Sequence, residues 1–309
     1  MMRSTSSVQH ILCATDLTPR SAAAWNRAVS LARLTGARLT LLHVIKPGQP
    51  ERAARVRANR AYAALLAEAD RALGTSSGID IAVHRGNVRD VIVSAASELN
   101  VDLVVIAAPK SRRFDPIVGT TAERLVRAAK RPVLVVRREV EGGYRNVAIA
   151  ADLSPATAPM ISTALRLGAL DSASATVVHA VTPPYEGMMK YAGLDASIIE
   201  RYQYSEQQAA RQRLQTIISD AGLPFASTRM IVRNDPAATM IHAVLEYEQP
   251  EVLAIGASRW FLLKRLLIGS VADRVLRTAP CDVLVIPNQP SSAVAVRGDT
   301  AVVSRPVSI

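Results

Sequence analysis

Acidic, hydroxyl and glycine residues recur at two corresponding places in the chain, with a spacing that suits a phosphate-bearing ligand. Asp16 and Asp152 each follow a short apolar run and precede a Leu, a hydroxyl residue and a Pro. Later in each half, a pair of small residues precedes a helix-like segment; these pairs are Gly119 with Thr120 and Gly269 with Ser270. Glycine at a helix N-terminus leaves backbone N–H groups open to an anion. An ordinary helix start with a hydroxyl residue near its cap explains the same spacing equally well.

The sequence lacks the residue patterns of a fast enzyme. It contains no Ser/His/Asp set, no paired-histidine metal spacing and no nucleophile elbow. His43 and His179 occupy matching positions near the ends of apolar runs, and we expect them to be structural. The two cysteines, Cys13 and Cys281, are too few for a disulfide framework or a metal cluster. We expect both to be buried, reduced thiols.

The candidate positions correspond because the chain is duplicated. It reads GTTAERLVRAAKRPVLVV from Gly119 and GSVADRVLRTAPCDVLVI from Gly269, and eight of these 18 positions are identical. The two halves also begin alike, with ILCATDLTPRSAAAWNRAVSLA from Ile11 and VAIAADLSPATAPMISTALRLG from Val147. An internal repeat of this kind fixes the architecture before any residue chemistry does.

Each half alternates short β-branched runs with longer helical patterns. Strands are predicted at 9–15, 38–45, 79–84, 102–107 and 132–137, and again at 146–151, 174–181, 226–233, 251–256 and 282–286. Helices are predicted at 19–35, 50–74, 87–99 and 119–130, and again at 155–170, 196–221, 235–247 and 269–279. Pro19 and Pro155 suit the first helical turn, after a Thr or Ser able to cap it. This alternation of apolar strands with helices predicts α/β domains with doubly wound parallel sheets.

A length of 309 residues fits two domains of about 150 residues each. We place them at 1–140 and 146–287, with a linker from Glu139 to Arg145 and a tail at 288–309. The last strands carry the runs VLVV and VLVI. We expect these runs to pair at the interface, because exposed apolar edges are a liability. We expect two distinct domains rather than one continuous ten-stranded sheet.

Positive charge is concentrated in the first half. Residues 1–140 hold 22 Lys/Arg against 11 Asp/Glu, whereas residues 141–309 hold 15 of each, so the whole net charge of +11 lies in the first half. One cluster comprises Arg52, Arg55, Arg57 and Arg60. Such a patch favours an anionic partner such as a nucleotide, a nucleic acid or a lipid headgroup. A solvated arginine-rich surface is the alternative, and nucleic acid is disfavoured because aromatic residues are not interleaved with the arginines.

The apolar runs are too short to cross a membrane, because none approaches the roughly 18 residues that a span needs. The first residues, MMRSTSSVQH, lack the apolar stretch of a secretory signal. We therefore expect a cytoplasmic protein. The segment from Pro183 to Ile199 is longer than a plain connection and rich in Met and Tyr. It suggests a lid or the lining of an apolar cavity, although helix packing explains most such residues.

These motifs together resemble the universal stress protein family, and specifically its tandem E-type members. The resemblance covers about residues 8–287 and rests on the D-L-[ST]-P start, the histidine near the end of the second strand, and the G-[ST]-x-A-[ED]-R helix followed by V-L-V. It implies a five-stranded sheet of order 3-2-1-4-5 in each half. Many members dimerise through their last strands, so the resemblance implies a pseudo-dimer within one chain.

The ATP-binding branch of the family carries G-x2-G-x9-G-[ST] after the fourth strand, and both halves depart from this motif. In the second half Gly256, Gly269 and Ser270 match, but Arg259 replaces the middle glycine. In the first half Ala107 and Lys110 replace both leading glycines, and the loop to Gly119 and Thr120 is one residue shorter. Arg259 would obstruct a phosphate chain, or its guanidinium would hold a phosphate instead.

The resemblance also implies the rest of the nucleotide site. Asp16 and Asp152 match the position that contacts the adenine or ribose, and Val44 and Ala180 match the strand end beside the adenine. We expect any nucleotide, such as ATP with Mg²⁺, to occupy the second half. The function expected is a stress-response or regulatory binding module for a small-molecule ligand, with possible further pairing as a homodimer. The alternatives are a slow ATPase and a carrier or sensor of an amphipathic, lipid-like ligand.

Overall fold

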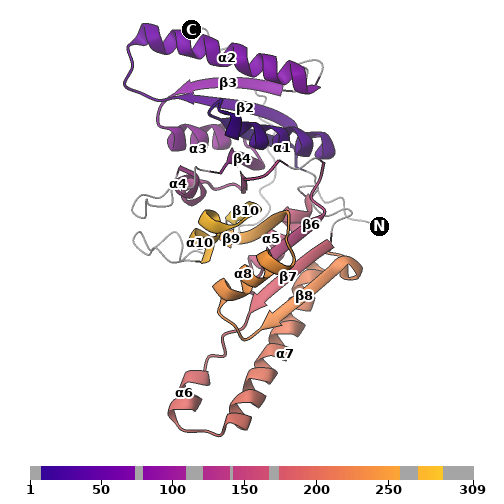
Figure 1. Ribbon diagram of the computed structural model, residues 1–309. Coiled ribbons are helices and arrows are strands. Elements are labelled where there is room, and N and C mark those ends of the chain that lie inside the picture. Colours follow the sequence, from indigo (N-terminus) through magenta and orange to yellow (C-terminus); the bar gives the residue numbers. More distant parts are fainter. Residues whose placement is uncertain are drawn as a thin grey trace.

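The chain folds into two similar series of strands and helices (Figure 1). The structure is a computed structural model that describes residues 8–73, 79–108, 121–139, 142–166, 174–257 and 271–287. The first series comprises β1 (His10–Thr15), α1 (Pro19–Thr35), β2 (Arg38–Ile45), α2 (Glu51–Leu73), β3 (Ile79–Arg85), α3 (Val88–Glu98), β4 (Leu103–Ala107), α4 (Thr121–Ala128) and β5 (Val133–Val136). These elements confirm the predicted strands and helices of the first half to within about two residues at each end.

The described part of the second series has one α-helix and one 3-10 helix more than that of the first. It comprises β6 (Asn146–Ala150), α5 (Thr157–Ala164), β7 (Ser174–Ala180), α6 (Glu186–Tyr191), α7 (Ala196–Asp220), the 3-10 helix η2 (Phe225–Ser227), β8 (Thr228–Arg233), α8 (Ala237–Tyr247), β9 (Val252–Ala257), α10 (Val271–Thr278) and β10 (Asp282–Pro287). The short helix α6 was not predicted. The expected helix start at Pro155 is wrong, because α5 begins at Thr157 after a turn.

All ten strands belong to one sheet, in the order β3-β2-β1-β4-β5-β10-β9-β6-β7-β8. Within each half the order is 3-2-1-4-5, as the family resemblance implied. The last strands pair antiparallel, with Val135 opposite Val283 and Val133 opposite Val285, so the predicted intrachain pseudo-dimer is confirmed. The expectation that the chain would not form a continuous ten-stranded sheet is wrong, because hydrogen bonding between two edge strands itself joins their sheets.

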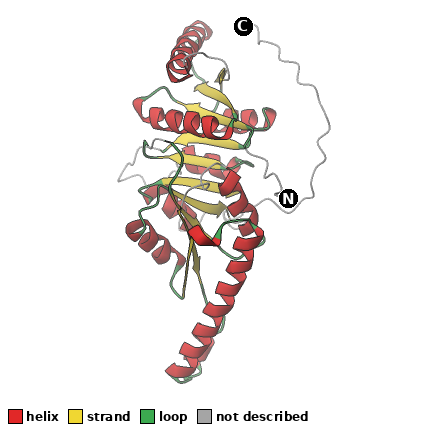
Figure 2. Cartoon of the chain, turned by 90° about the vertical axis from the view of Figure 1, so that its right-hand side faces the viewer, coloured by secondary structure: helices red, strands yellow, loops and turns green. Residues whose placement is uncertain are grey.

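Two layers of helices cover the two faces of this sheet, and each layer spans both halves (Figure 2). One face packs against α1, α2, α5 and α7, through side chains such as Trp25, Leu65 and Leu214. The opposite face packs against α3, α4, α8 and α10, through side chains such as Ile92, Leu125 and Met240. Both clusters continue across the junction of β5 and β10, where Leu134 and Leu284 belong to the first and Val135 and Val283 to the second. The two halves therefore share their hydrophobic cores.

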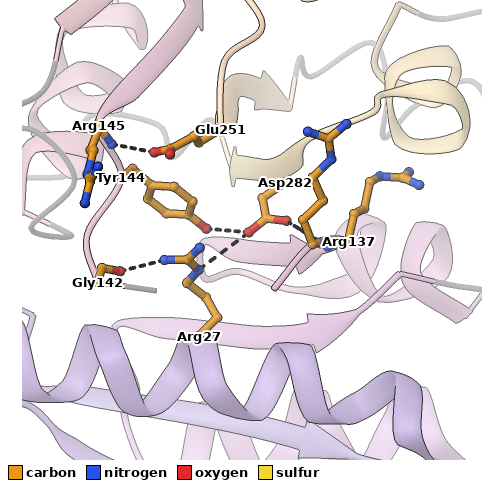
Figure 3. Close-up of polar contacts among 8 residues, drawn as sticks. Arg27, Arg137, Gly142, Tyr144, Arg145, Glu251 and Asp282 are labelled. Carbon is orange, nitrogen blue, oxygen red and sulfur yellow. Dashed lines mark hydrogen bonds and ion pairs between the residues drawn. The ribbon is translucent and has the colours of Figure 1, made fainter. Parts of the chain in front are cut away.

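A buried polar cluster ties the two halves and the connection between them together (Figure 3). Asp282, at the start of β10, is fully buried, and its Oδ1 accepts hydrogen bonds from the backbone N–H groups of Arg137 and Arg138. Its Oδ2 accepts the hydroxyl proton of Tyr144 at 2.7 Å and lies 3.7 Å from Nε of Arg27 on α1. The described part of the predicted linker is therefore anchored at the interface and does not act as a plain spacer.

Arg27 is buried beside the ring of Tyr144, with its guanidinium carbon 4.2 Å from the ring centroid. Its Nη1 donates to the carbonyl oxygen of Gly142 at 2.8 Å. The ion pair between Arg27 and Asp282 occurs only once in the duplicated chain, because Thr163 stands at the position that corresponds to Arg27 and Pro132 at the position that corresponds to Asp282. The interface is therefore asymmetric although the fold is nearly two-fold symmetric.

Candidate functional site

The first half contains a cavity of about 400 Å³ at the carboxyl ends of its central strands. The strand order reverses between β1 and β4, and ligands of open α/β sheets bind in the crevice at that point. Thr15 and Asp16 after β1, Val44 near the end of β2 and Ala107 at the end of β4 line the cavity. Its inner walls are apolar, with Ile92 from α3 and Ile106 from β4 among the lining residues.

Two cationic side chains also line this cavity. Arg20 lies in the first turn of α1, and Lys46 follows the last residue of β2. The sequence reasoning missed both, although the excess of basic residues in the first half was a signal. The second half has Ala156 and Thr182 at the corresponding positions. An apolar interior with cations among its lining residues suits a ligand that has an apolar body and an anionic group.

Each candidate aspartate precedes a strained leucine. Leu17 has a φ of 58° and Leu153 a φ of 57°, a left-handed backbone that costs a non-glycine residue about 1 kcal/mol. Both leucines pack against the hydrophobic core, which holds the loop in this conformation. Strain of this kind persists where the surrounding structure fixes it, and it is often found at binding sites. Because this strained conformation occurs at the same place in both halves, the loops after β1 and β6 are candidate binding loops.

The two aspartates organise these loops through hydrogen bonds. Oδ1 of Asp16 accepts the backbone N–H of Thr18 at 3.1 Å and its hydroxyl at 2.5 Å. The prediction that Thr18 caps α1 is therefore wrong for its side chain, although Pro19 does begin the helix. Oδ1 of Asp152 accepts the backbone N–H of Ser154 at 3.0 Å and the hydroxyl of Thr157 at 2.9 Å.

These hydrogen bonds decide the charge of both aspartates. Partial burial alone would raise the pKa of Asp16 and of Asp152. The hydrogen bonds from the neighbouring hydroxyl and N–H groups outweigh burial, so the pKa of each carboxyl lies below its ordinary value. Both side chains are therefore ionised at neutral pH and can accept hydrogen bonds from a ligand.

The histidines near the ends of β2 and β7 have structural partners. Nδ1–H of His43 donates to the carbonyl oxygen of Thr15 at 2.9 Å, and Nδ1–H of His179 donates to that of Ala151 at 2.9 Å. Each histidine thus ties the end of its own strand to the backbone at the end of the first strand of its half. Within the described ranges, no group of three or more His, Cys, Asp or Glu side chains is placed to hold a metal ion.

The structure brings together only part of the predicted site. Asp16 and Val44 line the cavity of the first half. In the second half Asp152 follows β6, Ala180 ends β7, and Gly256 lies in β9 opposite Ile286. The remaining candidates lie outside the described residues; these are Gly119, Thr120, Arg259, Gly269 and Ser270. The assignment of a nucleotide to the second half thus stays a prediction.

The chain thus consists of two tandem α/β units, each with a D-L-[ST]-P loop after its first strand, and the comparisons identify the family of these units. The universal stress protein family matches residues 7–137 and again residues 143–287. The chain belongs to the universal stress protein family and carries two copies of its domain. The domain boundaries at 140 and 146 and the tail at 288–309 stay predictions.

Known proteins match this chain over most of its length. A universal stress protein of Mycobacterium tuberculosis is 25% identical over 277 residues, which cover 84% of this chain and 93% of the relative. A crystal structure of a universal stress protein from Archaeoglobus fulgidus superposes with a TM-score of 0.66 at 16% identity, over 91% of this chain and 98% of that one. A Pseudomonas aeruginosa protein of unknown function superposes with a TM-score of 0.62 at 19% identity, over 92% and 94%. The likeness to these structures supports the fold alone.

Proposed function

We propose that the chain is a ligand-responsive regulatory module of the stress response, which binds a small anionic molecule with an apolar body. The observation that carries this proposal is the cavity of the first half, lined by apolar side chains together with Asp16, Arg20 and Lys46. A nucleotide has the matching chemistry. Its base fits between apolar side chains, its ribose hydroxyls can donate to an ionised carboxylate, and its phosphates attract cations. We place the module in the cytoplasm, where its two thiols would stay reduced.

The second half is the other candidate for the nucleotide, because its sequence keeps more of the glycine motif. Gly256, Gly269 and Ser270 would allow close backbone approach to phosphates, whereas Ala107 stands at the first position of the motif in the first half. Mg²⁺ would be held largely by the phosphates of ATP, together with the carboxylate of Asp152. A lipid-like anion is the alternative ligand of the first-half cavity, since a long apolar body and an anionic head match the same lining.

Removing the cations of the first half should weaken nucleotide binding. We expect the double variant Arg20→Gln and Lys46→Gln to bind ATP at least about 100-fold more weakly, because hydrogen bonds to charged groups contribute about 1.5–3 kcal/mol each and every 1.4 kcal/mol is tenfold in affinity. Isothermal titration calorimetry with ATP, with and without Mg²⁺, measures the change. The matched control is Arg52→Gln with Arg60→Gln, which removes the same charge from exposed positions on α2 and should leave the affinity unchanged.

Glycine substitutions then decide between the two halves. If affinity survives Arg20→Gln with Lys46→Gln but is lost on Gly269→Val, the ligand lies in the second half and the first-half assignment is wrong. In that case Arg259→Gly strengthens binding if the side chain obstructs the phosphates and weakens binding if the guanidinium holds one. Absence of any binding by ATP, together with a native mass spectrum free of copurified small molecules, would refute the binding proposal itself.

A further inference from the structure

The second half carries a helical arm that has no counterpart in the first. Five residues separate β2 from α2, whereas 15 residues, including α6, separate β7 from α7. We define the arm as residues Pro184 to Ala209, which comprise α6 and the first half of α7. None of these residues is buried, and the first buried residue of α7 is Ala210. Figures 1 and 2 show the arm extending away from the sheet.

The arm presents an apolar surface to solvent. Its exposed large side chains include Tyr185 at 60%, Met188 at 71%, Tyr191 at 96%, Leu194 at 41% and Tyr204 at 64% exposure. Tyrosine and methionine are enriched at protein interfaces, where they provide large contact areas. A group of such residues on a projecting element marks an interaction site, because isolated exposed residues are ordinary but contiguous ones are not. Within the described residues, α6 packs mainly on α7, and the ring centroids of Tyr185 and Tyr202 lie 6.4 Å apart.

The charge of the arm limits what can bind it. It contains four acidic and two basic residues, so its net charge is −2. Glu186 pairs with Lys190 inside the arm at 2.5 Å. Asp195, Glu200 and Glu206 form no ion pair with any other described residue. An anionic membrane, a nucleic acid and a second arm all carry the same sign, so the arm fits a basic protein surface.

The outer face of α2 is such a surface, and it lies beyond the opposite end of the sheet (Figure 1). Residues 51–60 hold four arginines and one glutamate, a net charge of +3, and the glutamate already pairs with Arg85 at 2.5 Å. Arg52, Val56 and Arg60 are exposed and lie at intervals of four residues, so they share one face of the helix. Tyr62 and Leu66 are also exposed, at 49% and 37%. Among described carboxylates, none forms an ion pair with Arg52, Arg55, Arg57 or Arg60.

We infer that the arm of one chain docks on the outer face of α2 of a second copy. The apolar side chains of the arm would pack on Val56, Tyr62 and Leu66, and the carboxylates of the arm would face the arginines. The arm cannot reach α2 of its own chain, because ten strands at about 4.8 Å spacing separate them by about 40 Å. Because the contact joins two different surfaces, each added copy leaves one arm and one α2 free. Copies therefore assemble head to tail, as a ring or an open filament.

Sedimentation velocity with the full chain tests this assembly. We expect the average mass to rise with protein concentration at about 50 mM salt and to fall at about 500 mM salt, since screening shortens the range of surface charges. Reversing the arm (Asp195→Lys, Glu200→Lys, Glu206→Lys) or reversing α2 (Arg52→Glu, Arg55→Glu, Arg60→Glu) should each abolish association. Mixing the two variants restores it, because each reversed surface then meets its complement on the other chain.

The apolar contribution is tested separately from the charges. The variant Met188→Ser with Tyr191→Ser should associate at least about 10-fold more weakly at every salt concentration. Its matched control is Tyr247→Ser on α8, which removes a tyrosine of 80% exposure far from the arm and should change nothing. A chain that stays monomeric at all concentrations overturns the inference. The inference is also overturned if the arm variant loses association while the α2 variant keeps it, because the arm would then bind a surface other than α2.

Discussion

Replacing Asp282 by alanine lowers the free energy of unfolding by about 3–5 kcal/mol, the usual cost of removing one partner of a buried ion pair. Arg27 is 1% exposed and Asp282 is not exposed at all, so the variant leaves a guanidinium buried without a carboxylate. The variant also leaves the hydroxyl of Tyr144 and two backbone N–H groups without their acceptor. Urea unfolding at neutral pH, followed by circular dichroism, measures the loss.

Two controls separate the buried pair from a general charge effect. Asp80→Ala breaks the exposed ion pair with Arg38, whose side chain is 61% exposed, and should cost less than about 1 kcal/mol. The double variant Arg27→Met with Asp282→Ala removes both charges and should recover part of the loss, because no charge then stays buried alone. If Asp282→Ala costs no more than Asp80→Ala, the cluster does not stabilise the interface.

Alkaline pH should destabilise the fold steeply, through its two buried thiols. Burial raises the pKa of Cys13 from 9.0 to about 12 and that of Cys281 to about 11. The unfolded chain releases these protons near pH 9, whereas the folded chain retains them, so stability is complete below pH 9 and is lost as pH rises. One pKa unit corresponds to about 1.4 kcal/mol, so linkage of the two thiols lowers the free energy of unfolding by about 4 kcal/mol in total between pH 9 and pH 11.

Urea unfolding at a series of pH values, with a reducing agent present, measures this slope. The double variant Cys13→Ala with Cys281→Ala should be less stable at pH 8 but should lose markedly less stability between pH 9 and pH 11. The stability of this double variant would still fall as the pH rises above 10, because burial also raises the pKa of Tyr144 well above its ordinary value. If the stability of the parent and of the double variant fell equally steeply with pH, the thiols would have the same pKa in the folded and the unfolded chain, and the prediction would be wrong.

The fold could be predicted because its signals are local and occur twice. The apolar runs at 38–45 and 174–181 gave β2 and β7 to within one residue, and the repeated VLV runs gave the pairing of β5 with β10. The start of α5 was misplaced by two residues, because Pro155 and Ala156 form a turn although Pro19, at the corresponding position of the first half, begins α1. A helix was missed at α6, whose six residues are too few for a periodic pattern.

The site could be predicted only in part, because its remaining features depend on distant residues. Arg27 occurs in a helix like any surface arginine, and only the partner 255 positions away explains its burial. Arg20 lies in the first turn of a helix and Lys46 in a loop, and a basic residue is common in both places. Only the fold shows that both side chains line one cavity. Asp16 was identified because it recurs as Asp152 after the first strand of each half, and Val44 was identified through the family resemblance.

The antiparallel pairing of β5 with β10 also places the two candidate ligand sites on opposite sides of the molecule. All strands of one half run opposite to those of the other, so their carboxyl ends lie on opposite margins of the sheet. A molecule in the cavity after β1 therefore cannot touch the loop after β6. The two sites would fill independently in space, with a stoichiometry of up to two per chain, and any communication between them would have to pass through the shared core.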